Sequence, residues 1–162
     1  MRLCGHGTPH PSHVVDRDSA SEDLARGVRL MVASADAGMR AWVQDGFPAH
    51  STLCAVGDDG SVLAELARAE RADVCLLDLR LPGALPAIGA LIAAVPRLRI
   101  VAWAAMDDDP ALVDAVHAGA TGCIVGRPDR PAIARALADV TVGRPALPRA
   151  LVARLVAQLR IA

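Results

Sequence analysis

Apolar residues along the chain fall into short uninterrupted runs that alternate with stretches of helical spacing. The runs predict five strands, at residues 28–33, 52–56, 74–77, 99–103 and 122–125. The stretches that follow them predict five helices, at residues 36–47, 61–69, 85–95, 107–117 and 129–142. Because strands and helices alternate and the connections are short, the pattern predicts an α/β fold with a parallel sheet and helices on both of its faces.

The run at residues 74–77 ends on a single carboxylate, Asp78, shortly before a turn at Pro82 and Gly83. Four apolar residues without polar alternation suit a strand that is covered on both faces. Asp78 is then at the carboxyl end of the strand, where open α/β sheets place their ligands and their chemistry. The alternative is that Asp78 only caps the loop that follows it.

The two ends of the chain differ from this alternating part. Residues 1–24 mix His, Pro, Ser, Gly and Asp without periodicity, so we interpret them as a flexible N-terminal tail. The cysteine and the three histidines of this tail fit none of the common zinc-binding patterns. The sequence thus divides into a tail, a domain over residues 25–147 and a C-terminal segment over residues 148–162.

Residues 148–161 have the spacing of one amphipathic helix. Its apolar stripe consists of Leu151, Val152, Leu155, Val156 and Leu159. Such a stripe needs a partner surface because its burial is favourable by roughly 1.5–3 kcal/mol for each side chain. We expect a homodimer, since symmetric pairing is the commonest way to cover such a surface. The alternatives are that the stripe folds back onto its own domain or covers a downstream domain.

Composition and charge narrow the classes of function. The chain has 162 residues, 53% of them apolar, and a net charge of −1, so it offers no electrostatic footprint for nucleic acid or an anionic membrane. It has no apolar run of roughly 20 residues that would span a bilayer, and no signal peptide at its start. We therefore expect a cytoplasmic location. The four cysteines are far apart and are expected to be reduced core residues.

Residues 73–83, with the sequence Asp-Val-Cys-Leu-Leu-Asp-Leu-Arg-Leu-Pro-Gly, resemble the phospho-acceptor strand of response regulator receiver domains. The resemblance extends over residues 27–147 and is to the subclass in which the receiver precedes a helix-turn-helix DNA-binding domain. It implies a flavodoxin-like, doubly wound five-stranded parallel sheet of strand order 2-1-3-4-5. It also makes Asp78 the candidate phospho-acceptor of a two-component signalling pathway.

The same resemblance shows what the phosphorylation site lacks at the end of the first strand. Receivers use Mg²⁺ to neutralise the charge that builds on the phosphoryl oxygens, and the family holds the ion with an acidic pair beside the phospho-acceptor. The positions that match this pair are Ser34 and Ala35. Asp36 comes one residue late and is expected to cap the following helix. With Asp78 as the single carboxylate, Mg²⁺ binding is expected to be weak.

Three further family positions also differ. The hydroxyl that contacts the phosphoryl group matches Ala104, the lysine after the last strand matches Gly126, and the aromatic switch residue matches Cys123. Arg127 restores a cation if the loop shifts by one residue, although the forked guanidinium of Arg does not simply replace Lys. The sequence therefore predicts a degenerate site on an intact scaffold.

These changes lead to two hypotheses on function. The first is an atypical receiver that controls transcription through dimerisation or through ligand or protein binding, independently of phosphorylation. Small residues in place of charged ones are expected to leave a roomier, less polar cleft that suits a small organic ligand. The second is a conventional receiver that a histidine kinase phosphorylates on Asp78. In both, contact with DNA requires an output domain absent from this chain.

An enzyme with Asp78 as nucleophile is a third class, and the sequence does not favour it. Such an enzyme needs a second carboxylate as acid or base, and Leu79, Arg80 and Leu81 provide none. No Gly-rich phosphate loop or metal-binding His motif occurs elsewhere. We expect no enzymatic activity, no cofactor beyond weak Mg²⁺ and no membrane partner. The chain is either a piece of a longer regulator or a free-standing receiver.

Overall fold

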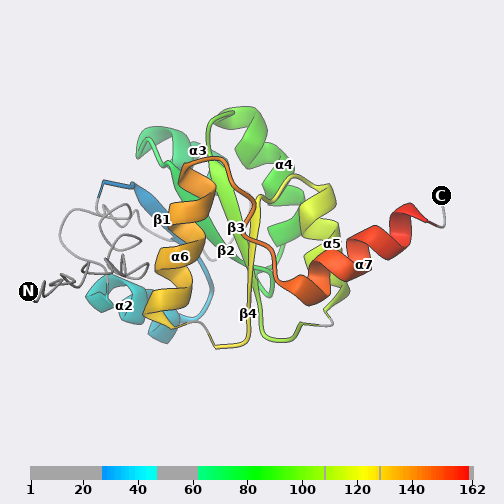
Figure 1. The fold of residues 1–162 in the computed structure, drawn as a ribbon. Helices are drawn as coiled ribbons and strands as arrows, with labels where there is room; N and C mark the ends of the chain where they lie inside the picture. Colours follow the sequence, from blue (N-terminus) through cyan, green and yellow to red (C-terminus); the bar gives the residue numbers. More distant parts are fainter. Residues whose placement is uncertain (1–26, 47–61, 108, 128, 161–162) are drawn as a thin grey trace, which may run out of the picture.

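A computed structural model describes residues 27–46 and 62–160, apart from residues 108 and 128. It contains one sheet of four parallel strands in the order β1-β2-β3-β4 (Figure 1). The strands are β1 (Leu30–Ala33), β2 (Val74–Asp78), β3 (Arg99–Ala104) and β4 (Gly122–Val125). The predicted α/β class with a parallel sheet is confirmed.

We predicted five strands, and the described sheet has four. The difference arises because the predicted strand at residues 52–56 lies outside the described residues. The complete order 2-1-3-4-5 therefore stays a prediction. The first strand also begins two residues later than predicted, at Leu30, because the backbone N–H of Arg29 is donated to the Asp73 carboxylate at 3.1 Å.

Six helices connect and follow the strands in the described part of the chain. They are α2 (Ala37–Gly46), α3 (Leu63–Ala69), α4 (Ala84–Ala94), α5 (Pro110–His117), α6 (Arg130–Thr141) and α7 (Arg149–Leu159). Helices α5 and α6 start later than predicted because an aspartate serves as the cap. Asp109 accepts the N–H of Ala111 and Asp129 accepts the N–H of Ala132, each with a proline in the first helical turn. Among the described helices, none is long and apolar enough to cross a bilayer.

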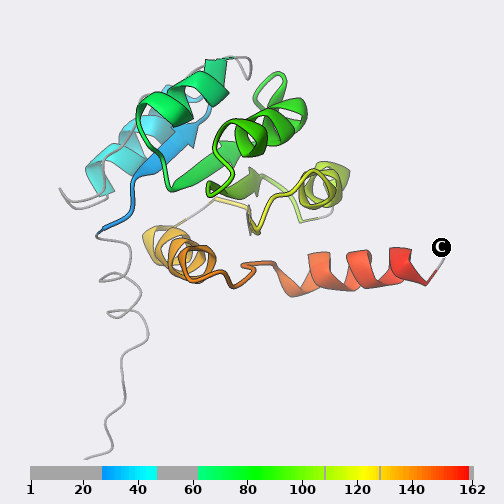
Figure 2. The same ribbon diagram turned by 90° about the horizontal axis from the view of Figure 1, so that it is seen from above.

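Two hydrophobic clusters cover the two faces of the sheet, as alternating strand residues require. Leu77 belongs to the cluster formed with α3, α4 and α5, whereas Leu76 belongs to the cluster formed with α2 and α6. Figure 2 shows α6 on one side of the sheet and α4 on the other. Asp78 has the parity of Leu76, so its side chain is on the side of α2 and α6.

The segment after α6 is attached to the sheet and to α5. Gly143 has φ +80° and turns the chain, after which Ala146 forms a parallel bridge with Gly122. Helix α7 then packs against α5, and its Leu151 is fully buried in the cluster on that side (Figure 1). Part of the predicted stripe therefore packs on its own domain.

Candidate functional site

The positions singled out from the sequence gather at one edge of the sheet. Ser34 follows β1, Asp78 ends β2, Ala104 ends β3 and Gly126 follows β4. The strands are parallel, so their carboxyl ends meet at this edge. The register places Asp78 opposite Trp103 of β3.

The Asp78 carboxylate is buried, with 3% exposure, and accepts four hydrogen bonds. The Ser34 hydroxyl donates to Oδ2 at 2.8 Å, and the Arg80 backbone N–H donates to Oδ1 at 2.9 Å. The Arg80 guanidinium donates twice more, from Nε to Oδ1 at 3.1 Å and from Nη2 to Oδ2 at 2.9 Å. Both carboxylate oxygens are thus engaged, and the buried charge has an opposite charge beside it.

Arg80 is held in this position from two sides. A turn closed by the N–H of Leu81 on the Asp78 carbonyl, at 3.0 Å, brings it back toward the carboxylate. Its guanidinium carbon lies 4.5 Å from the centre of the Trp103 ring, a cation–π contact. The hydrogen bond to Asp78 raises the pKa of Arg80 further above its ordinary value, so the guanidinium keeps its positive charge at any physiological pH.

Trp103 is fixed in turn by the loop after β4. Its Nε1–H donates to the Gly126 carbonyl at 2.6 Å, and its side chain is largely buried. Gly126 has φ +77°, a left-handed conformation that an L-residue with a side chain adopts only with strain. The family's lysine position is therefore a backbone acceptor for an indole in this chain.

The end of β1 supports Asp78 through backbone contacts. Ser34 Oγ accepts the N–H of Asp36 at 3.1 Å, and the Arg40 guanidinium donates to the Ser34 carbonyl at 2.8 Å. Asp36 accepts the N–H of Met39 at 3.0 Å, which confirms the predicted helix cap. That hydrogen bond lowers the pKa of Asp36 below its usual value, so this carboxylate is charged at neutral pH.

The remaining predicted positions contribute no polar group to Asp78. Ala35 is exposed and Ala104 is buried in the core. Cys123 is buried as well, and burial raises the pKa of its thiol to about 12, so it stays a neutral core residue. Arg127 is exposed and lies near Trp103, not on Asp78.

A magnesium ion does not fit these residues. Mg²⁺ needs several oxygen ligands in near-octahedral arrangement, and Asp78 is the carboxylate at this edge that the family would use. Both of its oxygens bond to Arg80, whose positive charge repels a cation. Within the part of the chain that the structure describes, no three His, Cys, Asp or Glu side chains form a metal-binding group.

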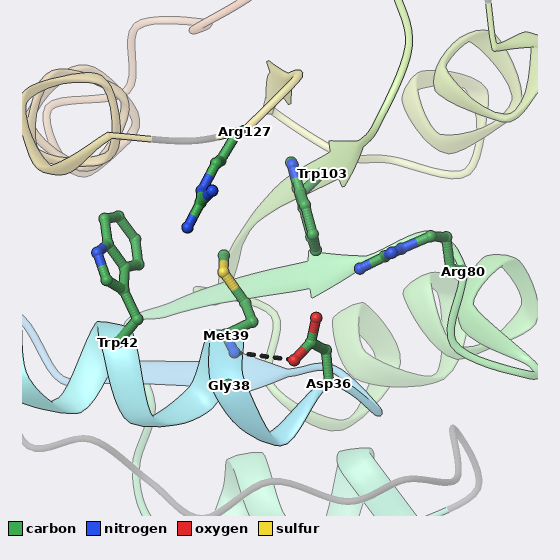
Figure 3. Close-up of a pocket in the computed structure, with 7 residues that line it drawn as sticks. All are labelled: Asp36, Gly38, Met39, Trp42, Arg80, Trp103 and Arg127. Carbon is green, nitrogen blue, oxygen red and sulfur yellow. Dashed lines mark hydrogen bonds between the residues drawn. The ribbon is translucent and has the colours of Figure 1, made fainter.

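A cleft of about 510 Å³ opens beside the Asp78–Arg80 pair, between α2 and the loop after β4 (Figure 3). Its walls are formed by Asp36, Gly38, Met39, Trp42, Arg80, Trp103 and Arg127. We expected the cleft to be lined by the small residues Ser34, Ala35, Ala104 and Gly126, and none of these four lines it. Tryptophan, methionine and arginine side chains form it instead.

Comparisons with known proteins identify the family. The chain is 38% identical over 116 residues to the DNA-binding transcriptional activator DevR/DosR of Mycobacterium tuberculosis, covering 69% of this chain and 54% of that protein. It is 33% identical over 108 residues to the probable transcriptional regulatory protein NarL of the same species, covering 64% of this chain and 49% of that one. The chain thus spans about half the length of the curated relatives it matches. No protein-family model matches it.

Solved structures give the same result for the fold. The signal receiver domain of the putative response regulator NarL from Mycobacterium tuberculosis is 30% identical, with a TM-score of 0.62, and the match covers 72% of this chain and 98% of that domain. A LuxR-family two-component response regulator from Aurantimonas sp. SI85-9A1 has a TM-score of 0.67 at 21% identity, covering 83% of this chain and 99% of that one. The chain belongs to the family of response regulator receiver domains.

Proposed function

We propose that this chain is an atypical receiver domain that regulates its output independently of phosphorylation. The observation that carries the proposal is the ion pair between Asp78 and Arg80, which engages both oxygens of the carboxylate. The curated relatives are transcription regulators by name, and a similar solved structure is the receiver domain of a response regulator, so a signalling module is the class of function that we favour over an enzyme.

Phosphorylation of a carboxylate requires a free oxygen as nucleophile and a cation for the charge on the phosphoryl group. Here the nucleophilic oxygens accept hydrogen bonds from Arg80 and Ser34. Hydrogen bonds to charged groups contribute about 1.5–3 kcal/mol each. Breaking even one of them leaves the open carboxylate populated at roughly 1–10%. Ser34 and Ala35, at the positions that match the family's acidic pair, carry no carboxylate, which supports the same conclusion.

We further propose that the output is transcription control through a DNA-binding domain. The support is the similarity to DevR/DosR, which is named as a DNA-binding transcriptional activator. The chain itself has a net charge of −1, so direct DNA binding by the receiver is not part of the proposal.

Helix α7 is the element that we propose carries the signal, through a homodimer. Its Val152, Val156 and Leu159 side chains are 42%, 44% and 79% exposed. Figure 2 shows the C-terminal half of α7 extending beyond the other helices. A symmetric pair of such helices would cover this exposed face. The Arg154 guanidinium bonds the carbonyls of Asp107 and Asp109 at 3.0 and 3.3 Å, which connects α7 to the loop after β3.

The second candidate is a conventional receiver that a histidine kinase phosphorylates on Asp78. It is supported by the position of Asp78 at the carboxyl end of β2, in a chain that belongs to the receiver family. Under this alternative Arg80 would have to swing away from the carboxylate before each phosphoryl transfer.

Beryllofluoride, a mimic of the phosphoryl group, separates the two candidates. The chain is mixed with beryllofluoride and Mg²⁺ and observed by fluorine NMR, with Asp78→Asn as the control. The proposal predicts no protein-bound fluorine signal. A saturable bound signal that is lost in Asp78→Asn contradicts the proposal and supports the conventional receiver.

A further inference from the structure

The cleft beside the Asp78–Arg80 pair has the size and the walls of a small-molecule site. Its volume of about 510 Å³ is within the range of roughly 300–1,000 Å³ that is usual for ligand pockets. It opens between Met39 and Trp42 of α2 and Trp103 of β3 (Figure 3). Two indole rings and a thioether provide the apolar area against which a flat ring packs well.

Trp103 is preorganised for such a contact. The bond from its Nε1 to the Gly126 carbonyl fixes the ring, and the Arg80 guanidinium lies over it at 4.5 Å from the ring centre. In Figure 3, Arg80 is on one side of the ring, and Met39 and Arg127 are on the other. A ligand that meets this ring therefore does not have to order it first.

The charges in the cleft are unevenly distributed. Arg80 is neutralised by Asp78, and Asp36 is at the opposite end of the cleft from Arg127 in Figure 3. Among the described residues, Arg127 has neither a hydrogen-bond nor an ion-pair partner, and Figure 3 shows its guanidinium turned toward the space that Trp42, Met39 and Trp103 surround. A guanidinium binds a carboxylate or phosphate with two parallel hydrogen bonds.

From these contacts we infer that the cleft binds a planar, conjugated molecule with one acidic group, its ring against Trp42, Met39 and Trp103 and its acid on Arg127. The inference deepens the proposed function, on which it rests, by naming the chemical class of the ligand. Arg80 and Asp78 take part as a neutral pair that backs the Trp103 ring. Ligand binding at Trp103 would then affect the conformation of the loops that follow β2 and β4, since this ring contacts both Arg80 and Gly126.

The test uses the two tryptophans, which are the only ones in the chain. Proton–nitrogen NMR of the full chain gives two indole signals, assigned with Trp42→Phe, and 2-naphthoate is titrated beside its neutral amide, 2-naphthamide. We expect 2-naphthoate to shift both signals and the amide to bind about tenfold more weakly, equivalent to about 1.4 kcal/mol. Arg127→Met should weaken naphthoate binding by a similar factor, because the charge-assisted bonds are lost.

Arg130→Met is the matched control, since Arg130 is an exposed arginine at the start of α6 that does not line the cleft. It should bind 2-naphthoate as the parent does. The inference is overturned if neither indole signal moves, if acid and amide bind equally, or if Arg127→Met binds like the parent. The titration uses no phosphoryl donor. A failed titration would therefore contradict ligand binding in the cleft but not phosphorylation independence. Phosphorylation of Asp78 would contradict phosphorylation independence but not a positive result of the titration.

Discussion

Arg80 neutralises Asp78 from only two positions further along the chain, with Nε on Oδ1 at 3.1 Å and Nη2 on Oδ2 at 2.9 Å. The carboxylate is 3% exposed, whereas the arginine side chain is 52% exposed. The ion pair therefore has a buried anion and a partly solvated cation. The positive charge beside Asp78 therefore comes from a residue of the loop that directly follows the strand.

Replacing Arg80 with methionine should lower the stability of the domain. The change removes two charge-assisted hydrogen bonds and leaves Asp78 buried with Ser34 and one backbone N–H. We expect the free energy of unfolding to fall by about 1–3 kcal/mol, reduced from the value of a fully buried pair because Arg80 is half-exposed. Urea denaturation of Arg80→Met beside the exposed control Arg97→Met measures this, and the control should stay within about 0.5 kcal/mol of the parent.

A double-mutant cycle isolates the pair itself. If Asp78→Asn and Arg80→Met have additive effects in the double variant, the two side chains are not coupled and the assignment of the ion pair is wrong.

Restoring the acidic pair should restore Mg²⁺ binding only when Arg80 is also removed. The variant Ser34→Asp with Ala35→Asp supplies the missing carboxylates, but Arg80 still covers both oxygens of Asp78. We expect the double variant to bind Mg²⁺ weakly and the triple variant with Arg80→Met to bind at least about tenfold more tightly, since one hydrogen bond to a charged group corresponds to that factor. Isothermal titration calorimetry compares the two, and equal affinities would contradict a blocking role of Arg80.

The surroundings of Arg80 were predictable from the sequence, but the position of its side chain was not. The end of β2 and the turn at Pro82 and Gly83 followed from the apolar run and the turn residues. The direction of the arginine side chain did not, because it depends on Trp103 in another strand. From the sequence, Arg80 was noted only because it cannot supply the second carboxylate that an enzyme would need. The spacing of residues along the chain does not indicate its contact with the Trp103 indole.

The elements themselves were largely predictable, and the cleft was not. The predicted strand at residues 122–125 has the bounds of β4, because glycine and apolar residues mark it clearly. Met39 and Trp42 were on a correctly predicted helix, yet periodicity does not say that they face Trp103 across a cavity. The family resemblance led us to predict that four small residues line the cavity, and the structure shows that they do not. Contacts between distant segments were thus the missing information.

Leu159→Glu should weaken self-association without lowering the stability of the monomer. Leu159 is 79% exposed, so a charge there meets no core, whereas it would be unfavourable in an apolar dimer contact. Leu151→Ala is the comparison, since Leu151 is fully buried in its own domain and its truncation should destabilise by about 2–5 kcal/mol. Sedimentation equilibrium and thermal unfolding separate these effects. A parent chain that stays monomeric at high concentration rules out the proposed homodimer.

Alkaline conditions should destabilise the domain through Cys123. Burial raises the pKa of this thiol from 9.0 to about 12, so the unfolded chain loses the proton at lower pH than the folded chain does. The free energy of unfolding should therefore fall as the pH rises from about 9 toward about 12, by on the order of 3 kcal/mol. The chain has no tyrosine, and all 17 of its Lys and Arg residues are arginines, so few other groups titrate there.

Urea denaturation in the presence of a reducing agent, at several values of pH between about 9 and about 12, measures how steeply the free energy of unfolding falls with pH. Cys123→Ala is the control and should have a shallower dependence on pH. Identical slopes for parent and variant would show that ionisation of Cys123 does not drive the loss.

Phosphorylation of Asp78 is the most direct test of the central claim, that the ion pair with Arg80 keeps this carboxylate from serving as a phospho-acceptor. The chain is incubated with acetyl phosphate and Mg²⁺, and its intact mass is measured beside that of Asp78→Asn. The variant Ser34→Asp with Ala35→Asp and Arg80→Met serves as the control in which the carboxylate is freed and a metal site is supplied. We predict an unchanged mass for the parent chain. A parent chain that gains one phosphoryl group, with no gain in Asp78→Asn, contradicts the account.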